Sequence, residues 1–371
     1  MSKKIVHIII GLNIGGAELM LKRLVLHSQE KGKFHHEVIS LSDLGAIGYE
    51  LKQAGIPVYT LNMKSIFSLF NVFYSLRKLL KKIHPNVVQT WMYHADFIGG
   101  LVAKSLGIKK IIWGIRTTDV TQGGSKLTVI LRNICAKLSY SIPTNIICAA
   151  HVSKDLHIKV GYDASKIQVI ANGFELDKLV VGRENRDRIR QEFDISKEAI
   201  VIGSIGRFNI VKNQKFFVDV AVKLVELYPN LIFMLVGRDN TSNNNELMNW
   251  LKESNLIDNF RLLGQRNDVY CCLKAMDIFC LHSKTEGFPN VLGEAMGIGV
   301  IAVSTNVGDV PYLIDHKFIG SSLEELIFII SSIIDNKINI AEEIIRNKKK
   351  IENFYSMDKV ISSYELVYLE E

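Results

Sequence analysis

Apolar and polar positions alternate along this chain in a regular way, because short runs rich in Ile, Val and Leu are each followed by a longer stretch with helical periodicity. Short apolar runs bounded by turn residues are typical of strands buried on both faces, and the stretches between them predict covering helices. The alternation therefore predicts parallel sheets flanked by helices. The expected strands are Ile5–Ile10, Glu37–Ser40, Val58–Leu61, Val87–Thr90, Lys110–Gly114, Asn145–Ala149, Ile167–Ile170, Ile200–Ile205, Ile232–Val236, Phe260–Leu263, Ile278–Leu281 and Val300–Val303.

A charged, weakly periodic segment, Asn172–Asp194, separates two such series, and 371 residues are enough for two domains of ordinary size. We therefore predict an α/β protein with two Rossmann-like, doubly wound domains, residues 1–175 and 176–354. A closing helix at 355–371 is expected to complete the first. Ligands of doubly wound sheets bind beyond the carboxyl ends of the strands, so we expect a site there, in a cleft that the two domains face.

Composition excludes several classes of protein. The chain is 48% hydrophobic and 22% charged, which is ordinary for a globular protein, and it contains no run of about 18 apolar residues that could span a membrane. The short apolar run near the N-terminus lacks a cleavage site and is interpreted as a strand, so we expect a cytosolic protein. Five cysteines without C-x-x-C spacing are expected to be reduced thiols.

Charge is distributed unevenly. Residues 1–180 hold 23 Lys and Arg against 11 Asp and Glu, whereas residues 181–371 hold 22 against 27. A basic first half indicates an anionic partner, either nucleic acid or a membrane surface.

The segment 64–83 favours the membrane, because it contains five basic residues, four aromatic residues and no acidic residue. As a helix it would gather Phe70, Phe73 and Leu76–Leu80 on an apolar face, with cations near its C-terminal end. Such a helix could lie on anionic lipid. Alternatively, it could bury that face in the domain core, with the lysines favoured by the helix dipole. The two interpretations are compatible.

The first expected strand leads into a glycine-containing turn, Gly11–Glu18, and then into a helix. Glycines let a backbone approach a ligand closely, and free amides at a helix start favour phosphate. The spacing is not G-x-G-x-x-G, and Val38–Asp43 offers no convincing ribose-binding acid, which weighs against a nicotinamide or flavin enzyme. A tight turn without a ligand is the alternative.

The loop after the strand Ile200–Ile205 contains two cations five residues apart, Arg207 and Lys212. Arg207 could hold a diphosphate through a planar fork and Lys212 through a point charge. A solvated loop is the alternative interpretation.

The segment after Ile278–Leu281 carries the strongest signal. Glu286 lies in an expected loop, and Glu294 follows eight positions later on an expected helix. Carboxylates bind vicinal hydroxyls well, as sugars and ribose offer them. We expect Gly287 to permit a loop conformation closed to other residues. The amides of Phe288, Asn290, Val291 and Leu292 are then expected near a helix N-terminus, suited to phosphate or sugar hydroxyls.

Together these motifs resemble the retaining glycosyltransferases of the GT-B fold, in the large family 4 that includes bacterial polysaccharide and lipopolysaccharide enzymes. The resemblance covers roughly residues 1–315. It rests on Gly15-Gly16-Ala17-Glu18, Asn172-Gly173, Gly206-Arg207 with Lys212-Asn213, Leu235-Val236-Gly237 and Glu286 with Glu294.

The resemblance implies a donor site for a nucleotide-diphosphate sugar. Arg207 and Lys212 would hold the diphosphate, with Gly16 approaching it, while Glu294 would bind the ribose and Glu286 the transferred sugar. Backbone groups of Gly287–Leu292 would line the site, and Arg266 would sit close to the base. The implied donor residues are thus Gly16, Arg207, Lys212, Arg266, Glu286, Gly287, Phe288, Pro289, Asn290, Val291, Leu292 and Glu294, of which Glu286, Arg207 and Lys212 would act in catalysis.

Two residues are assigned to the acceptor side. His94 follows the fourth strand and could orient donor or acceptor hydroxyls in catalysis, although a structural histidine is the alternative. Many relatives carry a histidine at the end of the next strand, where this chain has Arg116, which could contact an anionic acceptor such as a lipid diphosphate. The segment after Ile314 is also shorter than the family pattern, which puts stability in doubt more than chemistry.

The implied reaction moves a hexose to a lipid-linked or growing surface-polysaccharide acceptor, on the inner face of a bacterial membrane. No D-x-D pair occurs, so neither a metal nor a cofactor is expected beyond the substrate, with a UDP-sugar favoured over a GDP-sugar. In this family the leaving phosphate is held to draw the proton from an acceptor that attacks on the same face. Alternatives are a nucleotide-sugar epimerase, a non-catalytic partner subunit and a nucleic-acid binder, for which no recognised module appears. The sugar, base, acceptor and oligomeric state stay open.

Overall fold

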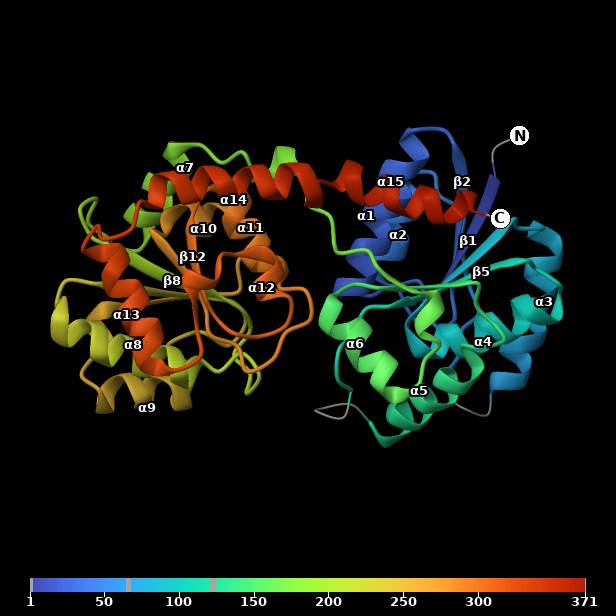
Figure 1. Cartoon of the computed structure of the whole chain (residues 1–371), viewed down its shortest axis with the longest axis horizontal. Helices are drawn as coiled ribbons and strands as arrows, with labels where there is room; N and C mark the ends of the chain where they lie inside the picture. Colours follow the sequence, from blue (N-terminus) through green and yellow to red (C-terminus); the bar gives the residue numbers. More distant parts are fainter. Residues whose placement is uncertain (1–2, 65–67, 121–124, 371) are drawn as a thin grey trace. The chain divides into compact units, whose positions relative to one another are not determined.

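The computed structural model describes residues 3–64, 68–120 and 125–370. The chain forms two compact units, which we call the first unit (Met1–Gly173 with Met357–Glu371) and the second unit (Phe174–Ser356). Each is built on one parallel sheet with helices on both faces (Figure 1). The predicted fold class, two Rossmann-like doubly wound domains, is confirmed.

The first unit has a seven-stranded sheet of order β3-β2-β1-β4-β5-β6-β7. One face is covered by α1, α2 and α15, and the other by α3, α4, α5 and α6, each with a buried apolar core. The strands are β1 (Lys3–Ile9), β2 (Phe34–Ser40), β3 (Val58–Thr60), β4 (Val87–Trp91), β5 (Lys110–Ile115), β6 (Asn145–Cys148) and β7 (Ile167–Val169). The helices are α1 (Gly16–Glu30), α2 (Gly45–Gln53), α3 (Leu69–Ile83), α4 (Met92–Ser105), α5 (Lys126–Leu138), α6 (His151–Val160) and α15 (Met357–Leu369).

The second unit has a six-stranded sheet of order β10-β9-β8-β11-β12-β13. Its strands are β8 (Val201–Ile205), β9 (Ile232–Val236), β10 (Phe260–Gly264), β11 (Ile278–Leu281), β12 (Ile301–Thr305) and β13 (Ile319–Gly320). Its helices are α7 (Arg183–Glu192), α8 (Gln214–Leu227), α9 (Asn245–Glu253), α10 (Val269–Ala275), α11 (Asn290–Ile298), α12 (Val310–Leu313), α13 (Leu323–Ile334) and α14 (Ile340–Tyr355).

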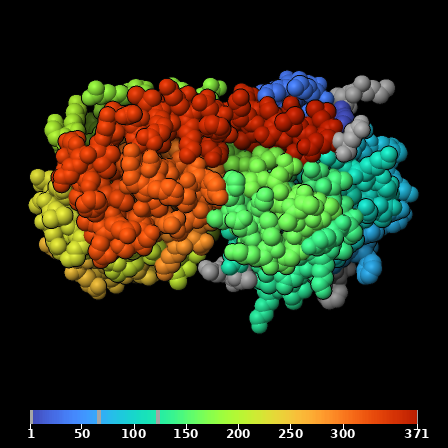
Figure 2. All heavy atoms as spheres, viewed as in Figure 1, coloured from blue at the N-terminus to red at the C-terminus, as the bar shows by residue number. Residues whose placement is uncertain are grey.

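Every predicted strand is present, with ends that differ by a few residues at most. The two-residue strand β13 was not predicted, because it is too short to form an apolar run. Helix α14 begins at Ile340, where the Asn339 side chain caps it by accepting a hydrogen bond from the Glu342 amide. The chain is extended at Ser356, and α15 then packs on α1 in the first unit. Both helices lie at the surface of their own unit, in red in Figure 2.

For the segment 64–83, the interpretation that the whole apolar face is buried in the domain core is wrong in part. Residues 65–67 of that segment lie outside the described residues. Helix α3 buries Val72, Leu76, Leu80 and Ile83 against the core shared with α4. Phe70 is 89% exposed and Phe73 37% exposed, so neither belongs to the packed face. The buried face of α3 is therefore the one that packs against α4, and it does not include the large aromatic side chains.

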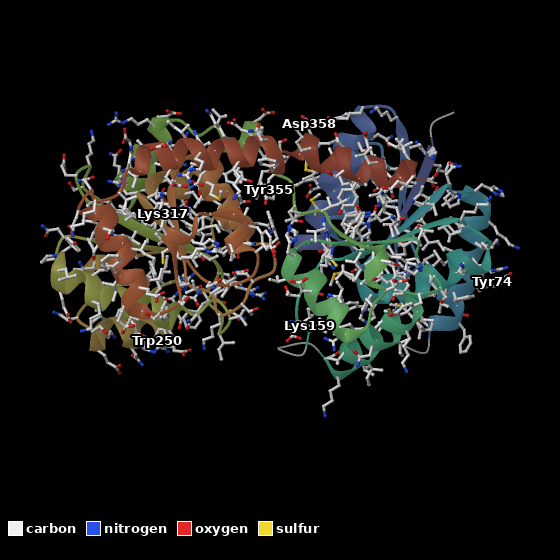
Figure 3. The ribbon with its side chains drawn as sticks, viewed as in Figure 1. Tyr74, Lys159, Trp250, Lys317, Tyr355 and Asp358 are labelled. Atoms are coloured by element: carbon white, nitrogen blue, oxygen red, sulfur yellow. The ribbon has the colours of Figure 1, made fainter. Side chains whose placement is uncertain are left out.

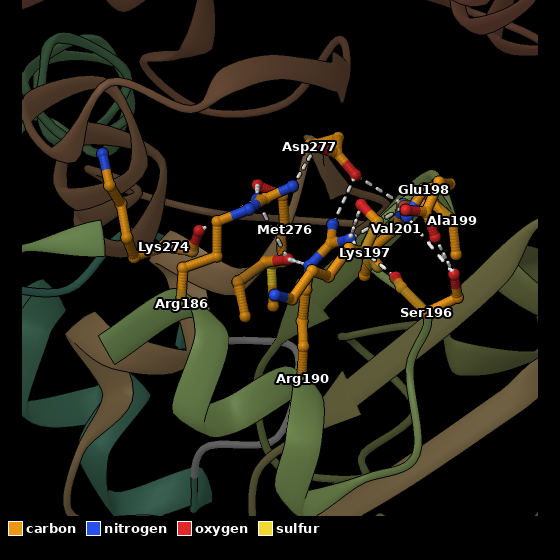
Figure 4. A network of polar contacts seen from close by, with 11 residues as sticks. Arg186, Arg190, Ser196, Lys197, Glu198, Ala199, Val201, Lys274, Met276 and Asp277 are labelled. Atoms are coloured by element: carbon orange, nitrogen blue, oxygen red, sulfur yellow. Dashed lines mark hydrogen bonds and ion pairs between the residues drawn. The ribbon is translucent and has the colours of Figure 1, made fainter. Parts of the chain in front are cut away.

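Two arginines of α7 attach this helix to the rest of the second unit. Arg190, almost fully buried, donates to the carboxylate of Asp277 at 2.7 Å and to the carbonyl oxygens of Ala275 and Ala199. Arg186 donates to the other carboxylate oxygen of Asp277, also at 2.7 Å (Figure 4). Because Asp277 additionally accepts the amide of Val201 at the start of β8, this network joins helix, sheet and loop.

The five cysteines are all unpaired, and four of them are buried, as predicted. Burial raises the pKa of the Cys280 thiol to about 12, so this thiol stays protonated at neutral pH. Among the described residues, none of the helices is both long and apolar enough to cross a membrane.

A directed chain of hydrogen bonds runs through buried polar groups of the first unit. The indole N–H of Trp91 donates to His7 Nδ1 at 3.2 Å, so His7 Nε2 carries the proton and donates to His36 Nδ1 at 2.9 Å. His36 Nε2 then donates to Ser28 Oγ at 3.0 Å. Each imidazole must be neutral to serve as both acceptor and donor.

Burial lowers the pKa of His36, His157 and His282 to about 4 and that of His7 well below its usual range. Between pH 6.5 and about 4 the unfolded chain binds protons that the folded chain does not, so stability is lost as the pH falls. We expect the free energy of unfolding to drop by about 1.4 kcal/mol for each of these histidines between pH 7.5 and 5.5. Calorimetric unfolding across that range measures the slope.

The variant His157→Gln provides the comparison. His157 accepts a hydrogen bond from the Tyr93 hydroxyl at 2.8 Å, so its replacement lowers stability at every pH, but the slope must also become shallower by one histidine. An unchanged slope in this variant would contradict the assignment.

Candidate functional site

Most of the predicted site residues follow strands at which the strand order of a sheet reverses. In the first unit β1 pairs with β4, and the chain continues from β1 toward one edge of the sheet and from β4 toward the other. In the second unit β8 and β11 have the same relation. A reversal of this kind opens a crevice at the carboxyl ends of the two strands, where doubly wound folds bind ligands. The glycine turn and His94 follow β1 and β4, while Arg207, Lys212 and Glu286 follow β8 and β11.

A lysine, a glutamate and a serine meet at the carboxyl edge of the second sheet. Lys212 Nζ donates to Glu286 Oε1 at 2.5 Å, and the buried Ser283 Oγ donates to the same oxygen at 2.6 Å. The two side chains of the ion pair are 28% and 13% exposed, so both are accessible from solvent. The structure thus brings together two residues predicted from loops more than seventy positions apart, and it adds Ser283, for which no role was predicted.

The loops at this edge are joined by main-chain hydrogen bonds. The amide of Lys284 donates to the Val211 carbonyl at 2.8 Å, and that of Gly206 donates to the Val236 carbonyl at 2.9 Å. The amide of Gly237 donates to the Gly264 carbonyl at 2.7 Å. These bonds hold the loops after β8, β9, β10 and β11 in one layer, so Lys212 and Glu286 are presented by fixed backbone.

Gly308, in the loop after β12, has a strained backbone conformation. Gly308 has φ +54°, and a Cβ there would lie 2.4 Å from the carbonyl oxygen of Gly287. The amide of Asp309 donates to that same carbonyl at 2.9 Å. The expectation that Gly287 itself adopts a conformation closed to other residues stays a prediction. The observed constraint is the close approach of the next loop to the Gly287 carbonyl.

Helix α11 begins at Asn290, as expected for a helix start after the Glu286 loop. The amides of Leu292 and Gly293 both donate to the Pro289 carbonyl, at 3.1 and 3.3 Å, which closes the first turn of the helix. Glu294 lies one helical turn after Asn290. The buried Phe288 packs on Phe174 and on Tyr355, which is labelled in Figure 3. These ring contacts hold the loop that carries Glu286 and Phe288 against the rest of the unit.

Two arginines predicted for the donor site have different surroundings. Arg207 is exposed, and its backbone is held by Gln214, which donates to its carbonyl at 2.9 Å. Arg266 is tied to Asp268 through two hydrogen bonds, at 2.8 and 3.0 Å, and to Glu192. Arg207 is therefore available to a ligand, while the side chain of Arg266 joins α7 to the loop after β10.

The two glycines of the turn in the first unit, Gly15 and Gly16, have different surroundings. A Cβ at Gly15, the N-cap of α1, would lie 2.3 Å from the Glu18 carboxylate, so Gly15 makes room for that side chain. Burial raises the pKa of the Glu18 carboxyl. A Cβ at Gly16 meets no described atom within 4 Å, which leaves its surface open.

His94 lies in the first turn of α4. The turn that leads to it contains Met92 at φ +72°, an uncommon conformation for a residue other than glycine and one that costs on the order of 1 kcal/mol. The next residue, Tyr93, is buried and hydrogen-bonded to Thr117 and His157, which fixes the helix start. Burial lowers the pKa of His94, so its imidazole is neutral at pH 7 and able to donate and accept hydrogen bonds.

Arg116 follows β5 and lies over the ring of Trp91, 5.1 Å from its centroid. One guanidinium nitrogen donates to the Ile170 carbonyl at 3.4 Å, a weak contact. Its Nε and Nη2 are buried and find no hydrogen-bond partner among residues 3–64, 68–120 and 125–370. A buried donor without a partner is uncommon in folded proteins, so the surroundings of Arg116 call for a functional explanation.

None of the clusters of His, Cys, Asp and Glu in the described parts of the chain brings three potential metal ligands together. In the second unit, the candidate ionic groups are the cations Arg207 and Lys212 and the carboxylates of Glu286 and Glu294, and in the first unit the candidate is Arg116.

Comparison with protein families and curated proteins gives consistent matches. Residues 14–178 match the family Glycosyltransferase Family 4, and residues 185–351 match Glycosyl transferases group 1. An Escherichia coli UDP-Gal:alpha-D-GlcNAc-diphosphoundecaprenol alpha-1,3-galactosyltransferase is 28% identical over 83% of this chain and 80% of its own. A Staphylococcus aureus capsular polysaccharide biosynthesis glycosyltransferase is 26% identical over 82% of this chain and 81% of its own.

Among solved structures, Anabaena HepE in complex with UDP superposes with a TM-score of 0.84 at 20% identity, covering 98% of both chains. The same protein in complex with UDP-glucose gives a TM-score of 0.80 over the same shares. At this level of identity the likeness shows the fold.

Replacement of Gly308 tests the packing beneath the site. We expect Gly308→Ala to destabilise the second unit by about 1–3 kcal/mol, because alanine disfavours this φ and its Cβ would contact the Gly287 carbonyl. Gly206→Ala is the matched control, since a Cβ there lies 3.4 Å from the nearest atom, an ordinary contact with Lys212. Equal unfolding midpoints in urea for both variants would contradict the packing argument.

Proposed function

This chain carries a Glycosyltransferase Family 4 domain followed by a Glycosyl transferases group 1 domain, and we propose that it is a retaining hexosyltransferase. Its donor is a nucleotide-diphosphate sugar, with UDP favoured, and its acceptor is a lipid-linked or growing surface polysaccharide. The observation that carries this proposal is the cluster of Lys212, Glu286 and Ser283 at the carboxyl ends of β8 and β11.

The donor is bound by the second unit. Arg207 and Lys212 pair with the diphosphate, and the amides at the start of α11 add hydrogen bonds at a helix N-terminus. Glu294 accepts from the ribose hydroxyls, while Glu286 accepts from hydroxyls of the sugar that is transferred. The base lies against the backbone near Gly264 and Arg266. The complexes of HepE with UDP and UDP-glucose, on the same fold, support a uridine nucleotide.

The ion pair between Lys212 and Glu286 has a consequence for binding. An incoming diphosphate competes with Glu286 for Lys212, and the sugar hydroxyls then take the place of the ammonium at the carboxylate. Ser283 donates to the same carboxylate oxygen and keeps it oriented during this exchange. The charges are paired before the substrate arrives, which lowers the cost of holding them partly buried.

In the reaction, the bond between the anomeric carbon and the β-phosphate oxygen breaks, and a bond from that carbon to the acceptor oxygen forms on the same face. The acceptor hydroxyl proton passes to the departing phosphate oxygen, so no protein nucleophile and no metal are needed. Arg207 and Lys212 stabilise the developing negative charge of the nucleoside diphosphate. On the acceptor side, neutral His94 orients hydroxyls, and the half-buried Arg116 contacts an anionic acceptor group through its positive charge.

We place the protein at the inner face of the cell membrane. The outer side of α3 carries Phe70 and Tyr74, 89% and 71% exposed, followed by the cations Arg77, Lys78 and Lys81. Tyr74 lies on the outer surface of the helix in Figure 3. Exposed aromatic residues beside cations suit the surface of an anionic bilayer. The names of the Escherichia coli and Staphylococcus aureus relatives, which mention diphosphoundecaprenol and capsular polysaccharide, support such an acceptor.

The proposal is tested by sugar transfer from a panel of UDP- and GDP-sugars to lipid-linked acceptors in membrane extract. We expect turnover of one donor by the wild type. Arg207→Ala should lose about 10²–10³-fold in kcat with weaker UDP binding, because a cation on the leaving group is removed. Glu286→Gln should lose transfer while UDP binding is kept or strengthened, since Lys212 is released from its carboxylate.

Lys215→Ala is the matched control, because Lys215 is an exposed lysine near Lys212 that pairs with Asp219 on its own helix. It should transfer sugar at the wild-type rate. No UDP binding and no transfer across the whole panel would overturn the proposal and favour a non-catalytic partner subunit.

A second prediction concerns the glycine turn. Gly16→Ala should leave stability unchanged or raise it by up to about 1 kcal/mol, because alanine favours the helix and its Cβ has room. If Gly16 contacts the donor diphosphate, the same Cβ raises KM for the donor. Steady-state kinetics beside thermal unfolding separates the two effects, and an unchanged KM would remove Gly16 from the donor site.

A further inference from the structure

The first unit contains an apolar groove that the donor chemistry does not use. It has a volume of about 460 Å³ and lies among α3, α4 and α5, beside the end of β1 at Ile10. Nine of its eleven lining residues are apolar, and the two polar ones are Lys64 and His94. A cavity of this size and lining suits the hydrocarbon part of a ligand.

Helix α5 presents one wall of this groove as an exposed apolar stripe. Leu127, Ile130 and Ile134 recur at helical spacing and are 64%, 54% and 40% exposed. A helix face of this kind normally packs against a core, yet these side chains line the groove instead. Contiguous exposed apolar surface on an otherwise packed protein marks a binding surface.

The charges around the groove have one sign. Helices α3 and α5 contain no acidic residue, whereas Lys126 begins α5 and Lys64 lies in the groove wall. The first unit as a whole holds 23 Lys and Arg against 13 Asp and Glu. An apolar groove with a cationic rim is complementary to a hydrocarbon chain that ends in an anionic group.

One part of the groove reaches the predicted acceptor side. His94 lines it from the first turn of α4, and Ile10 lines it directly after β1, so this part lies at the carboxyl edge of the sheet. A glycan placed along the remaining wall would bury hydroxyl groups against Phe97, Ile98 and Leu131 without hydrogen-bond partners, which is unfavourable. A hydrocarbon chain has no such cost.

We propose that this groove binds the first isoprenoid units of a polyprenyl-diphosphate acceptor, with the diphosphate directed toward Lys64 and His94. The inference deepens the proposed function and rests on it, because it assigns the carrier lipid of the acceptor a site on the enzyme. The chain enters from the side of α3 that carries Phe70 and Tyr74, so it passes from the membrane surface into the groove. Selection of the acceptor then begins with its lipid.

The test measures binding of farnesyl diphosphate to the full chain by calorimetric titration, below its aggregation concentration. Inorganic diphosphate serves as the head group alone and farnesol as the chain alone. We expect farnesyl diphosphate to bind at least about tenfold more tightly than either part, because chain and head group are held together. Leu127→Asp and Ile130→Asp should each weaken its binding by about tenfold or more, since a carboxylate is placed in the apolar wall that contacts the hydrocarbon chain.

Both substitutions are at exposed positions, so the fold should survive them, and thermal unfolding checks this. Leu366→Asp is the matched control: Leu366 is 65% exposed on α15, which covers the other face of the sheet. Its farnesyl diphosphate binding should equal that of the wild type. Equal binding by Leu127→Asp, Ile130→Asp and the wild type overturns the inference.

Two further readouts keep this inference apart from the proposed function. UDP binding by the groove variants should be unchanged, and its absence from the wild type as well would count against the donor site rather than the groove. Sedimentation with anionic vesicles tests the membrane surface. If the groove variants lose vesicle binding but keep farnesyl diphosphate binding, the stripe is a membrane contact and the inference is wrong.

Discussion

Each sheet of this protein is parallel, and that places every strand-to-helix turn at the same edge. A parallel strand can be followed by its neighbour only after a crossover, so the turns at the carboxyl ends collect in one layer while helices cover both faces. Where the strand order reverses, the turns of two adjacent strands diverge and leave a crevice. The glycine turn with His94, and Lys212 with Glu286, are in such positions. The positions of these candidate residues therefore follow from the connectivity of the strands, whatever side chains the turns carry.

Turns crowded along one edge restrict the residues that fit there. Gly237, at φ +132°, has no room for a Cβ because the Gly206 carbonyl lies 2.3 Å from its ideal position, and Gly308 is restricted in the same way by Gly287. The close approach allows the main-chain hydrogen bonds that join neighbouring turns. A charged pair such as Lys212 and Glu286 then needs few further contacts to be held in place, because the backbone that carries both residues is already fixed.

The sequence was sufficient for the strands, since buried parallel strands are apolar runs that few other elements imitate. It also indicated Lys212 and Glu286, which lie in turns directly after such runs. It did not indicate which face of α3 is buried, because that depends on where α4 lies. Nor did it identify Gly308 as the strained glycine, since a close approach between two loops leaves no local pattern. The start of α14 at Ile340 was marked by Asn339, a cap that is hard to recognise in a polar stretch.

The two units share a topology and differ in what their turns and helices present. After β8 and β11 the chain supplies cations and carboxylates, which suit a phosphorylated sugar. After β1 and β4 it supplies a glycine turn and His94, and α5 adds the stripe of Leu127, Ile130 and Ile134. From the sequence this stripe is indistinguishable from a core-facing helix side, because its spacing is the same. What distinguishes it is the absence of a covering element among the described residues, and that follows from how α3, α4 and α5 pack. A surface that costs solvation free energy while the protein is alone becomes favourable once a hydrocarbon chain covers it.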